Sequence, residues 1–214
     1  MNLFDAHSIV ANLGLIGILT IIFAETGLLV GLAFPGDSLL FIAGVAASSS
    51  GAAILGDAQL SAPMLFLLAP VMAIVGGEVG YWFGDRYGKK MFDRPNGRVF
   101  NQQKVIATDK WLKKYGPGRA LVLARFVPFV RTLINPMCGV IGLKRRQFRL
   151  WNAVGAIIWT QLVIGLGFVL GDVLEGSVDK YLLPVIGLII AISLFPVVIE
   201  LLKNWQSKRY NQES

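Results

Sequence analysis

Four charged residues stand inside or beside apolar segments, where charge is costly. Glu25 and Asp37 belong to one such segment, and Arg125 and Arg131 belong to another. An isolated charge at bilayer depth costs roughly 3 kcal/mol or more. These side chains are therefore expected to face one another or a polar cavity. Two acids and two bases gathered there would be equipped to bind an anion and to exchange protons.

The two arginines are the candidate anion-binding residues. Arg125 and Arg131 carry planar, permanently charged guanidinium groups, whose forked donors suit a phosphate group. Pro128 and Pro136 interrupt the same segment. Helix ends opened at these prolines would add backbone N–H donors to a phosphate site.

The carboxylates are the candidate proton carriers. Burial disfavours an ionised carboxylate, whereas a neighbouring arginine favours it. Protonation of Glu25 and Asp37 would then respond to whether an anion occupies the arginines. Glu78, near the end of another apolar segment, is an accessory candidate, although it could equally reach the membrane surface. The alternative for the whole set is structural: fixed ion pairs that join two segments.

Other site chemistries find little support. Cys138 is the only cysteine, which excludes an internal disulfide and a multi-cysteine zinc site, and its apolar neighbours favour a buried packing role. His7 is the only histidine and lies far from every motif. We therefore expect no metal, no cofactor and no enzymatic activity.

Both charged segments are broken. Pro35 cannot donate a backbone hydrogen bond and Gly36 relaxes the backbone, so residues about 25–47 form two apolar arms around a turn. Each arm is too short to cross a bilayer, which is typical of a re-entrant helical hairpin. Residues about 119–143 form a second hairpin, and basic sequence at both of its ends places those ends on one side of the membrane.

The composition indicates a membrane protein. The chain has 214 residues, of which 55% are hydrophobic and 15% charged, against about 25% charged in soluble domains. Its net charge of +7 does not indicate nucleic-acid binding, because sixteen of the twenty basic residues fall between Arg86 and Arg149. Basic residues between apolar spans mark cytoplasmic loops.

The apolar pattern predicts an all-α integral membrane protein with one multi-pass domain over residues 1–214. About four transmembrane helices are expected, at residues 9–24, 64–83, 150–170 and 181–202. Residues 48–63 are expected to be an external loop, and residues about 85–118 a cytoplasmic segment. That segment would contain an amphipathic helix, capped by Asn101 and ending near Tyr115, that lies on the membrane surface. Candidate interfacial anchors are found among Trp151, Trp159, Tyr181 and Trp205.

Counting crossings back from the basic tail places both termini in the cytoplasm. The two hairpins then enter from opposite sides, as in transporters built on an inverted repeat. The many glycines predict close helix contacts, within one chain or in a homo-oligomer.

Three motifs resemble those of the DedA family, the bacterial branch of the SNARE-associated or VTT-domain membrane proteins. The first comprises ETGLL at 25–29 and FPGDS at 34–38, and the second GE at 77–78, YW at 81–82 and GDRYG at 84–88. The third is RFVPFVRT, from Arg125 to Thr132, with Gly139 downstream. The chain departs from the usual pattern at Ala124, Asn135, Pro136 and Cys138, but all four charged positions match.

The resemblance implies two facing re-entrant hairpins and a location in the bacterial cytoplasmic membrane. It also implies function linked to the proton-motive force, through the residues that match Glu25, Asp37, Arg125 and Arg131. The implied partners are protons and a membrane lipid, either undecaprenyl phosphate or a phospholipid. Three alternatives remain at this point: a proton-coupled exporter of small ions or drugs, a membrane phosphatase or protease, and a scaffold that transports nothing.

Overall fold

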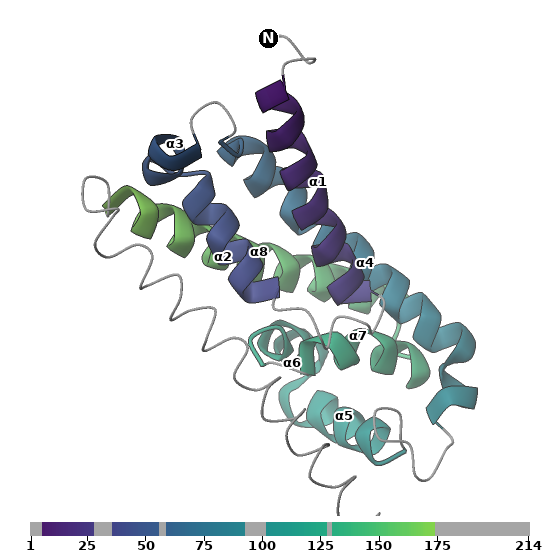
Figure 1. Cartoon of the computed structure of the whole chain (residues 1–214). Helices are drawn as coiled ribbons and strands as arrows, with labels where there is room; N and C mark the ends of the chain where they lie inside the picture. Colours follow the sequence, from purple (N-terminus) through teal and green to yellow (C-terminus); the bar gives the residue numbers. More distant parts are fainter. Residues whose placement is uncertain (1–5, 28–35, 56–58, 93–101, 128–129, 174–214) are drawn as a thin grey trace, which may run out of the picture.

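The computed structural model describes residues 6–27, 36–55, 59–92, 102–127 and 130–173, and every regular element within these ranges is a helix. Figure 1 shows the arrangement of the helices. They are α1 (Ala6–Gly27), α2 (Gly36–Ala46), α3 (Ser49–Leu55), α4 (Ala62–Phe92), α5 (Gln102–Tyr115), α6 (Pro117–Ala124), α7 (Val130–Val140) and α8 (Arg145–Val173). The prediction of an all-α chain is confirmed for the described residues.

Two helices, α4 and α8, are long and apolar enough to cross a membrane. At 1.5 Å per residue each exceeds the ~30 Å of a bilayer's hydrocarbon core. Only 33% of the most apolar stretch of each helix is buried, and large side chains such as Leu67 and Val169 are 68% and 60% exposed. The core helix of a soluble protein would be covered, so these outward apolar faces are compatible with contact with lipid.

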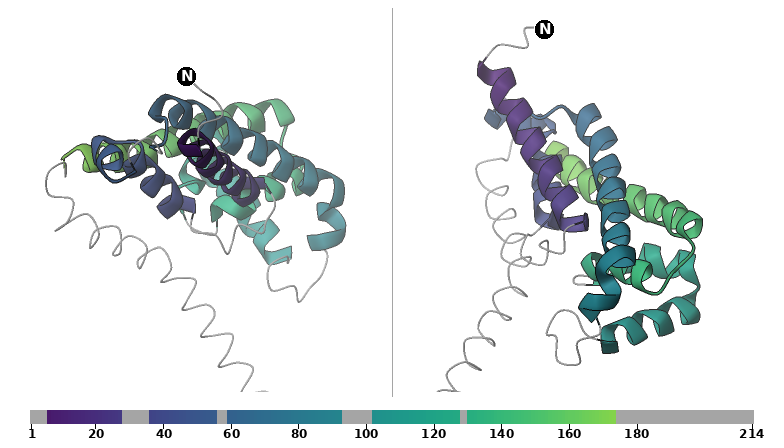
Figure 2. Two further views of the ribbon diagram at one scale, coloured as in Figure 1. Left: turned by 45° about the horizontal axis from the view of Figure 1, so that its top comes forward. Right: turned by 90° about the vertical axis from the view of Figure 1, so that its right-hand side faces the viewer.

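The helices pack closely because glycines occupy their crossing points. On α4, a Cβ at Gly76 would lie 2.8 Å from a backbone oxygen of α1, and a Cβ at Gly84 would lie 1.9 Å from the backbone oxygen of Pro136 in α7. A Cβ at Gly44 in α2 would lie 2.3 Å from the backbone oxygen of Ile164 in α8. The views in Figure 2 agree that α1 lies along α4 and that α2 crosses α8. The predicted close helix contacts therefore exist within one chain.

The second predicted hairpin segment is indeed broken. Helix α6 ends at Ala124 and α7 begins at Val130, and the two helices contact each other. In the first segment α2 begins at Gly36, after the predicted turn residue Pro35. Glu25, however, lies in the last turn of α1, and this helix continues past Glu25 to Gly27 without a break. The proposed first arm, residues 28–34, lies outside the described residues, as do Pro35 and Pro128.

Two surface expectations need correction. The predicted external loop 48–63 contains the short helix α3. Its first residue is capped by a residue far away in the sequence: the backbone N–H and hydroxyl of Ser49 donate to Asp172 Oδ1 at 2.9 and 2.8 Å. Small residues allow this turn of helix, and a carboxylate at a helix N-terminus stabilises it.

The predicted amphipathic helix exists as α5, from Gln102 to Tyr115, whereas its predicted cap, Asn101, lies outside the described residues. Part of the apolar face of α5 packs against protein: Leu112 is 6% exposed and packs with Leu121 and Ile134 of α6 and α7, whereas Tyr115 is 36% exposed. The predicted crossing 181–202 and the anchors Tyr181 and Trp205 lie outside the described residues.

Candidate functional site

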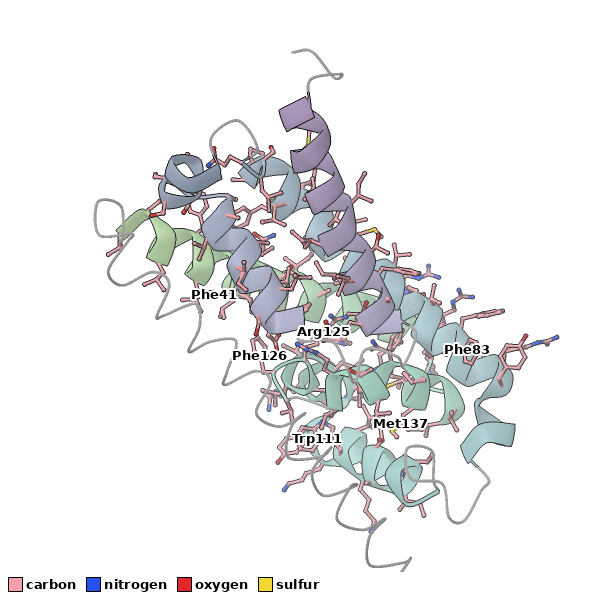
Figure 3. All side chains as sticks on the ribbon, in the orientation of Figure 1. Phe41, Phe83, Trp111, Arg125, Phe126 and Met137 are labelled. Atoms are coloured by element: carbon pink, nitrogen blue, oxygen red, sulfur yellow. The ribbon has the colours of Figure 1, made fainter. Side chains whose placement is uncertain are left out.

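The four charged residues come from four different helix ends. Glu25 is in the last turn of α1, Asp37 in the first turn of α2, Arg125 directly after α6, and Arg131 in the first turn of α7. Figure 3 shows Arg125 in the interior, where the ends of α1 and α2 approach α6 and α7. Residues that are separated by about a hundred positions in the sequence are thus brought to one place.

Arg131 joins the two acids. Its Nη2 forms an ion pair with Glu25 Oε1, and its Nη1 forms one with Asp37 Oδ1. The side chains of Arg131 and Glu25 are 9% and 1% exposed, whereas that of Asp37 is 44% exposed. Both terminal nitrogens of this guanidinium are therefore directed at carboxylates, and one carboxylate can be reached from outside.

Trp159 of α8 contacts both members of the Arg131–Asp37 ion pair. Its Nε1–H donates to Asp37 Oδ1 at 2.8 Å, and its ring lies 4.9 Å from the guanidinium carbon of Arg131, a distance at which a cation is attracted by the aromatic face. Trp159, one of the four candidates for interfacial anchors, is instead buried, with 2% of its surface exposed. It is a site residue that the sequence reading missed.

The other oxygen of Glu25 is held against α2. Oε2 is buried and has no hydrogen-bond partner among the described residues, and a Cβ on Gly36 would lie 1.5 Å from it. Only glycine at this position lets the carboxylate occupy its place. Gly36 thus provides space for Glu25, in addition to any role in the turn.

Arg125 has different surroundings. It is 4% exposed, and its Nη2 donates to Asn152 Oδ1 at 2.6 Å. No described carboxylate forms an ion pair with it. Arg125 and Arg131 are close enough to repel each other electrostatically. The structure therefore holds one arginine neutralised by acids beside another that is not.

Asn135, a departure from the family pattern, links the third motif to the first. Its Nδ2–H donates to the backbone oxygen of Thr26 at 3.0 Å, directly after Glu25. Thr132 and Pro136, two further accessory candidates, are buried in the same helix, α7. This helix runs through Pro136, so the helix end predicted at that proline is not present. Cys138 is a fully buried packing residue, as predicted. The departures therefore leave α7 packed against α1 and α4.

Glu78 belongs to a separate cluster. Its Oε2 lies 3.9 Å from Arg145 Nε and 3.7 Å from Arg149 Nε, so it joins α4 to the beginning of α8. The structure does not bring Glu78 together with the central four charges. Among the described residues there is no group of three or more His, Cys, Asp or Glu side chains that could hold a metal ion.

Replacing Trp159 should separate its two contacts. Trp159→Phe keeps an aromatic face over Arg131 but removes the N–H donor to Asp37, and we expect it to lower stability by about 1 kcal/mol. Trp159→Leu removes both contacts and should cost more, about 3 kcal/mol, because a large buried side chain is also truncated. Thermal unfolding of the detergent-purified variants measures both changes; equal losses would show that the aromatic ring over Arg131 contributes nothing.

Comparison with known proteins places the chain in a family. Residues 34–169 match the model of the VTT domain. Protein DedA of Escherichia coli (strain K12) is 36% identical over 184 residues, which cover 86% of this chain and 80% of that protein. No solved structure matches the chain.

Two further relatives carry names that state a membrane location. An uncharacterized membrane protein of Mycobacterium tuberculosis (strain ATCC 25618 / H37Rv) is 31% identical over 217 residues, covering 100% of this chain and 90% of the relative. Inner membrane protein YqjA of Escherichia coli (strain K12) is 30% identical over 170 residues, which cover 75% of this chain and 71% of that protein. These names are consistent with the long apolar helices and with a location in a bacterial membrane. The motifs, the matched domain and these relatives together establish that the chain belongs to the DedA family of VTT-domain membrane proteins.

Proposed function

We propose that this protein moves a lipid with a phosphate headgroup, in the first place undecaprenyl phosphate, across the bacterial cytoplasmic membrane and couples that movement to protons. The observation that carries the proposal is the unequal pairing of the two arginines. Arg131 is shared by two carboxylates, whereas neighbouring Arg125 has no carboxylate partner among the described residues. A buried cation without a counter-ion is costly, and a phosphate would supply one.

The pairing gives a physical route to coupling. When Glu25 and Asp37 are ionised, they hold both terminal nitrogens of Arg131. When the carboxyl groups take up protons, their attraction to Arg131 weakens, and Arg131 becomes available to join Arg125 at one phosphate group. Loss of those protons restores the carboxylates as competitors and releases the phosphate. The phosphate and the two carboxylates thus compete for a single guanidinium, so headgroup binding and proton uptake favour each other.

The lipid tail would not need to enter the site. Exposed apolar side chains occur from Met64 to Phe83 on α4 and from Leu150 to Val173 on α8, so a polyprenyl chain would remain beside them in the hydrocarbon while the headgroup reaches the arginines. Transport would require no covalent change in the lipid. We therefore propose a transporter and not an enzyme, with both termini in the cytoplasm.

The test is movement of fluorescently labelled undecaprenyl phosphate in proteoliposomes under an imposed pH gradient. We expect the wild-type protein to accelerate movement relative to protein-free liposomes, and a protonophore to remove most of that acceleration. Asp37→Asn, which keeps a hydrogen-bonding side chain but not the charge, should lose the dependence on the gradient.

Other outcomes identify the alternatives. Labelled lipid that moves no faster than in protein-free liposomes would overturn the proposal, and a flux of cations or a drug in the same vesicles would favour an exporter. Release of inorganic phosphate from the lipid would indicate a phosphatase. If neither a flux nor phosphate release is observed, the charged cluster has a scaffold role.

A further inference from the structure

The amide of Asn152 holds Arg125, and its orientation is determined by two contacts. Asn152 Oδ1 accepts from Arg125 Nη2 at 2.6 Å, and Asn152 Nδ2–H donates to the backbone oxygen of Ile74 in α4 at 3.0 Å. A carbonyl oxygen can only accept and a guanidinium can only donate. The amide therefore has one satisfactory orientation, with its oxygen toward Arg125.

The neighbouring glycines make room for this arrangement. A Cβ on Gly77 of α4 would lie 2.3 Å from Asn152 Oδ1, and a Cβ on Gly155 of α8 would lie 3.1 Å from Arg125 Cδ. The arginine side chain thus passes over Gly155 and ends at Asn152, one turn earlier in the same helix. Asn152 is 2% exposed and Arg125 is 4% exposed, so water contributes little to holding either one.

The chemical type of residue 152 matters because the neighbouring acids already have partners. Glu25 and Asp37 pair with Arg131, and Glu78 faces Arg145 and Arg149. At Arg125 the oxygen that accepts the hydrogen bond belongs to a neutral amide. An amide satisfies one donor but leaves the positive charge uncompensated, whereas a carboxylate would satisfy the donor and cancel the charge.

From this arrangement we propose that Asn152 is a positioning residue that sets the anion selectivity of the site: it fixes the Arg125 guanidinium in place without neutralising it. This inference rests on the proposed function, because it takes the phosphate group as the ligand. It assigns to α8 a part in recognising the headgroup, in addition to the motifs that contain the four charges.

Asn152→Asp tests the inference with an almost isosteric change. The new carboxylate would lie where Oδ1 now contacts Arg125, form an ion pair with it and remove the charge that attracts the phosphate. The probes are farnesyl phosphate, a short polyprenyl monophosphate, and farnesol, the same chain without charge. Binding to the detergent-purified full-length protein would be measured by titration.

The wild-type protein should bind farnesyl phosphate in preference to farnesol, and Asn152→Asp should weaken farnesyl phosphate binding about tenfold or more while leaving farnesol binding unchanged. A general loss of packing would weaken both ligands together. The difference between the two ligands is therefore the signature of a charge effect.

Gln161→Glu is the matched control. Gln161 also lies in α8, and its Nε2–H donates to a backbone oxygen of α4, that of Phe66, at 2.7 Å. The change from amide to carboxylate removes the same kind of bond between the same two helices, but none of the described arginines forms a hydrogen bond or ion pair with Gln161. Gln161→Glu should keep the preference for farnesyl phosphate within about twofold of the wild-type value.

Gly77→Ala provides a second test that does not add charge. Its Cβ would displace the Asn152 amide from Arg125, and we expect weaker farnesyl phosphate binding with farnesol binding retained. If the wild-type protein shows no preference for farnesyl phosphate, the proposed function fails. If the wild type shows the preference and both Asn152→Asp and Gly77→Ala retain it in full, the role of Asn152 is refuted while the proposed function stands.

Discussion

Arg131→Ala is expected to abolish transport of the lipid phosphate and to destabilise the protein by about 3 kcal/mol. The substitution removes the only described cation that pairs with Glu25 and Asp37, and Glu25 is 1% exposed, so its charge cannot be stabilised by water. The two carboxylates then have no guanidinium to pair with, and the competition between carboxylates and phosphate for Arg131 is lost. Thermal unfolding and transport in proteoliposomes measure the two effects.

Arg131→Lys is the companion variant, because it keeps the positive charge but not the two fixed donors of the guanidinium group. One ammonium group cannot present two fixed parallel donors to carboxylates from α1 and α2. We expect stability between that of wild type and Arg131→Ala, with transport still reduced about tenfold or more. Full transport by Arg131→Ala in vesicles would show that the cluster serves as a structural join between helices.

Gly36→Ala should have the second largest effect, and it should act on transport more than on stability. The added Cβ would lie 1.5 Å from Glu25 Oε2, so the carboxylate must move. Because the displaced atom is the end of a flexible side chain, the cost in stability should be modest, about 1–2 kcal/mol. The displaced carboxylate no longer meets Arg131 in the same geometry, and transport should fall about tenfold or more.

Gly165→Ala is the control for that variant. Gly165 lies within α8, and a Cβ there would meet nothing within 4 Å. The same change of residue type should leave transport unaltered and slightly favour the helix. If the two variants transport equally well, the position of the Glu25 carboxylate is not critical to the cycle.

Much of the central cluster could be predicted from the cost of buried charge. Glu25, Asp37 and Arg131 had to find partners in an apolar environment, and the structure brings them together. The difference between the two arginines was not predictable in this way. Arg125 and Arg131 stand in the same broken segment, and their different partners depend on which helices pack around each one.

Trp159 and Asn152 show why the remaining site residues were missed. A tryptophan in an apolar helix is as typical of a membrane interface as of a polar cluster, so the type of residue alone does not distinguish the two. Asn152 did carry a signal: a primary amide in a predicted crossing must find partners. Its identity as the partner of Arg125 required the packing of α8 against α4 and α6.

The secondary elements show the same division between local and non-local information. The positions of α4, α5 and α8 follow from long apolar or amphipathic runs, and the structure extends α4 and α8 beyond the predicted ends. Helix α3 could not be predicted, because its first residue is held by Asp172, more than a hundred positions away. The apolar face of α5 was evident in the sequence, but whether lipid or protein covers it was not.

The close glycine crossings define two sets of helices, and the ionic cluster lies where the two sets meet. Gly76 and Gly84 allow α4 to pack closely against α1 and α7, whereas Gly44 allows α2 to pack closely against α8. Glu25 and Arg131 therefore belong to the first set of helices, and Asp37 and Trp159 belong to the second. Because Asn152 and Gln161 of α8 also donate to backbone oxygens of α4, the two sets are held together away from the cluster. A local rearrangement that opened the Arg131–Asp37 contact would therefore leave Arg131 paired with Glu25 within the first set.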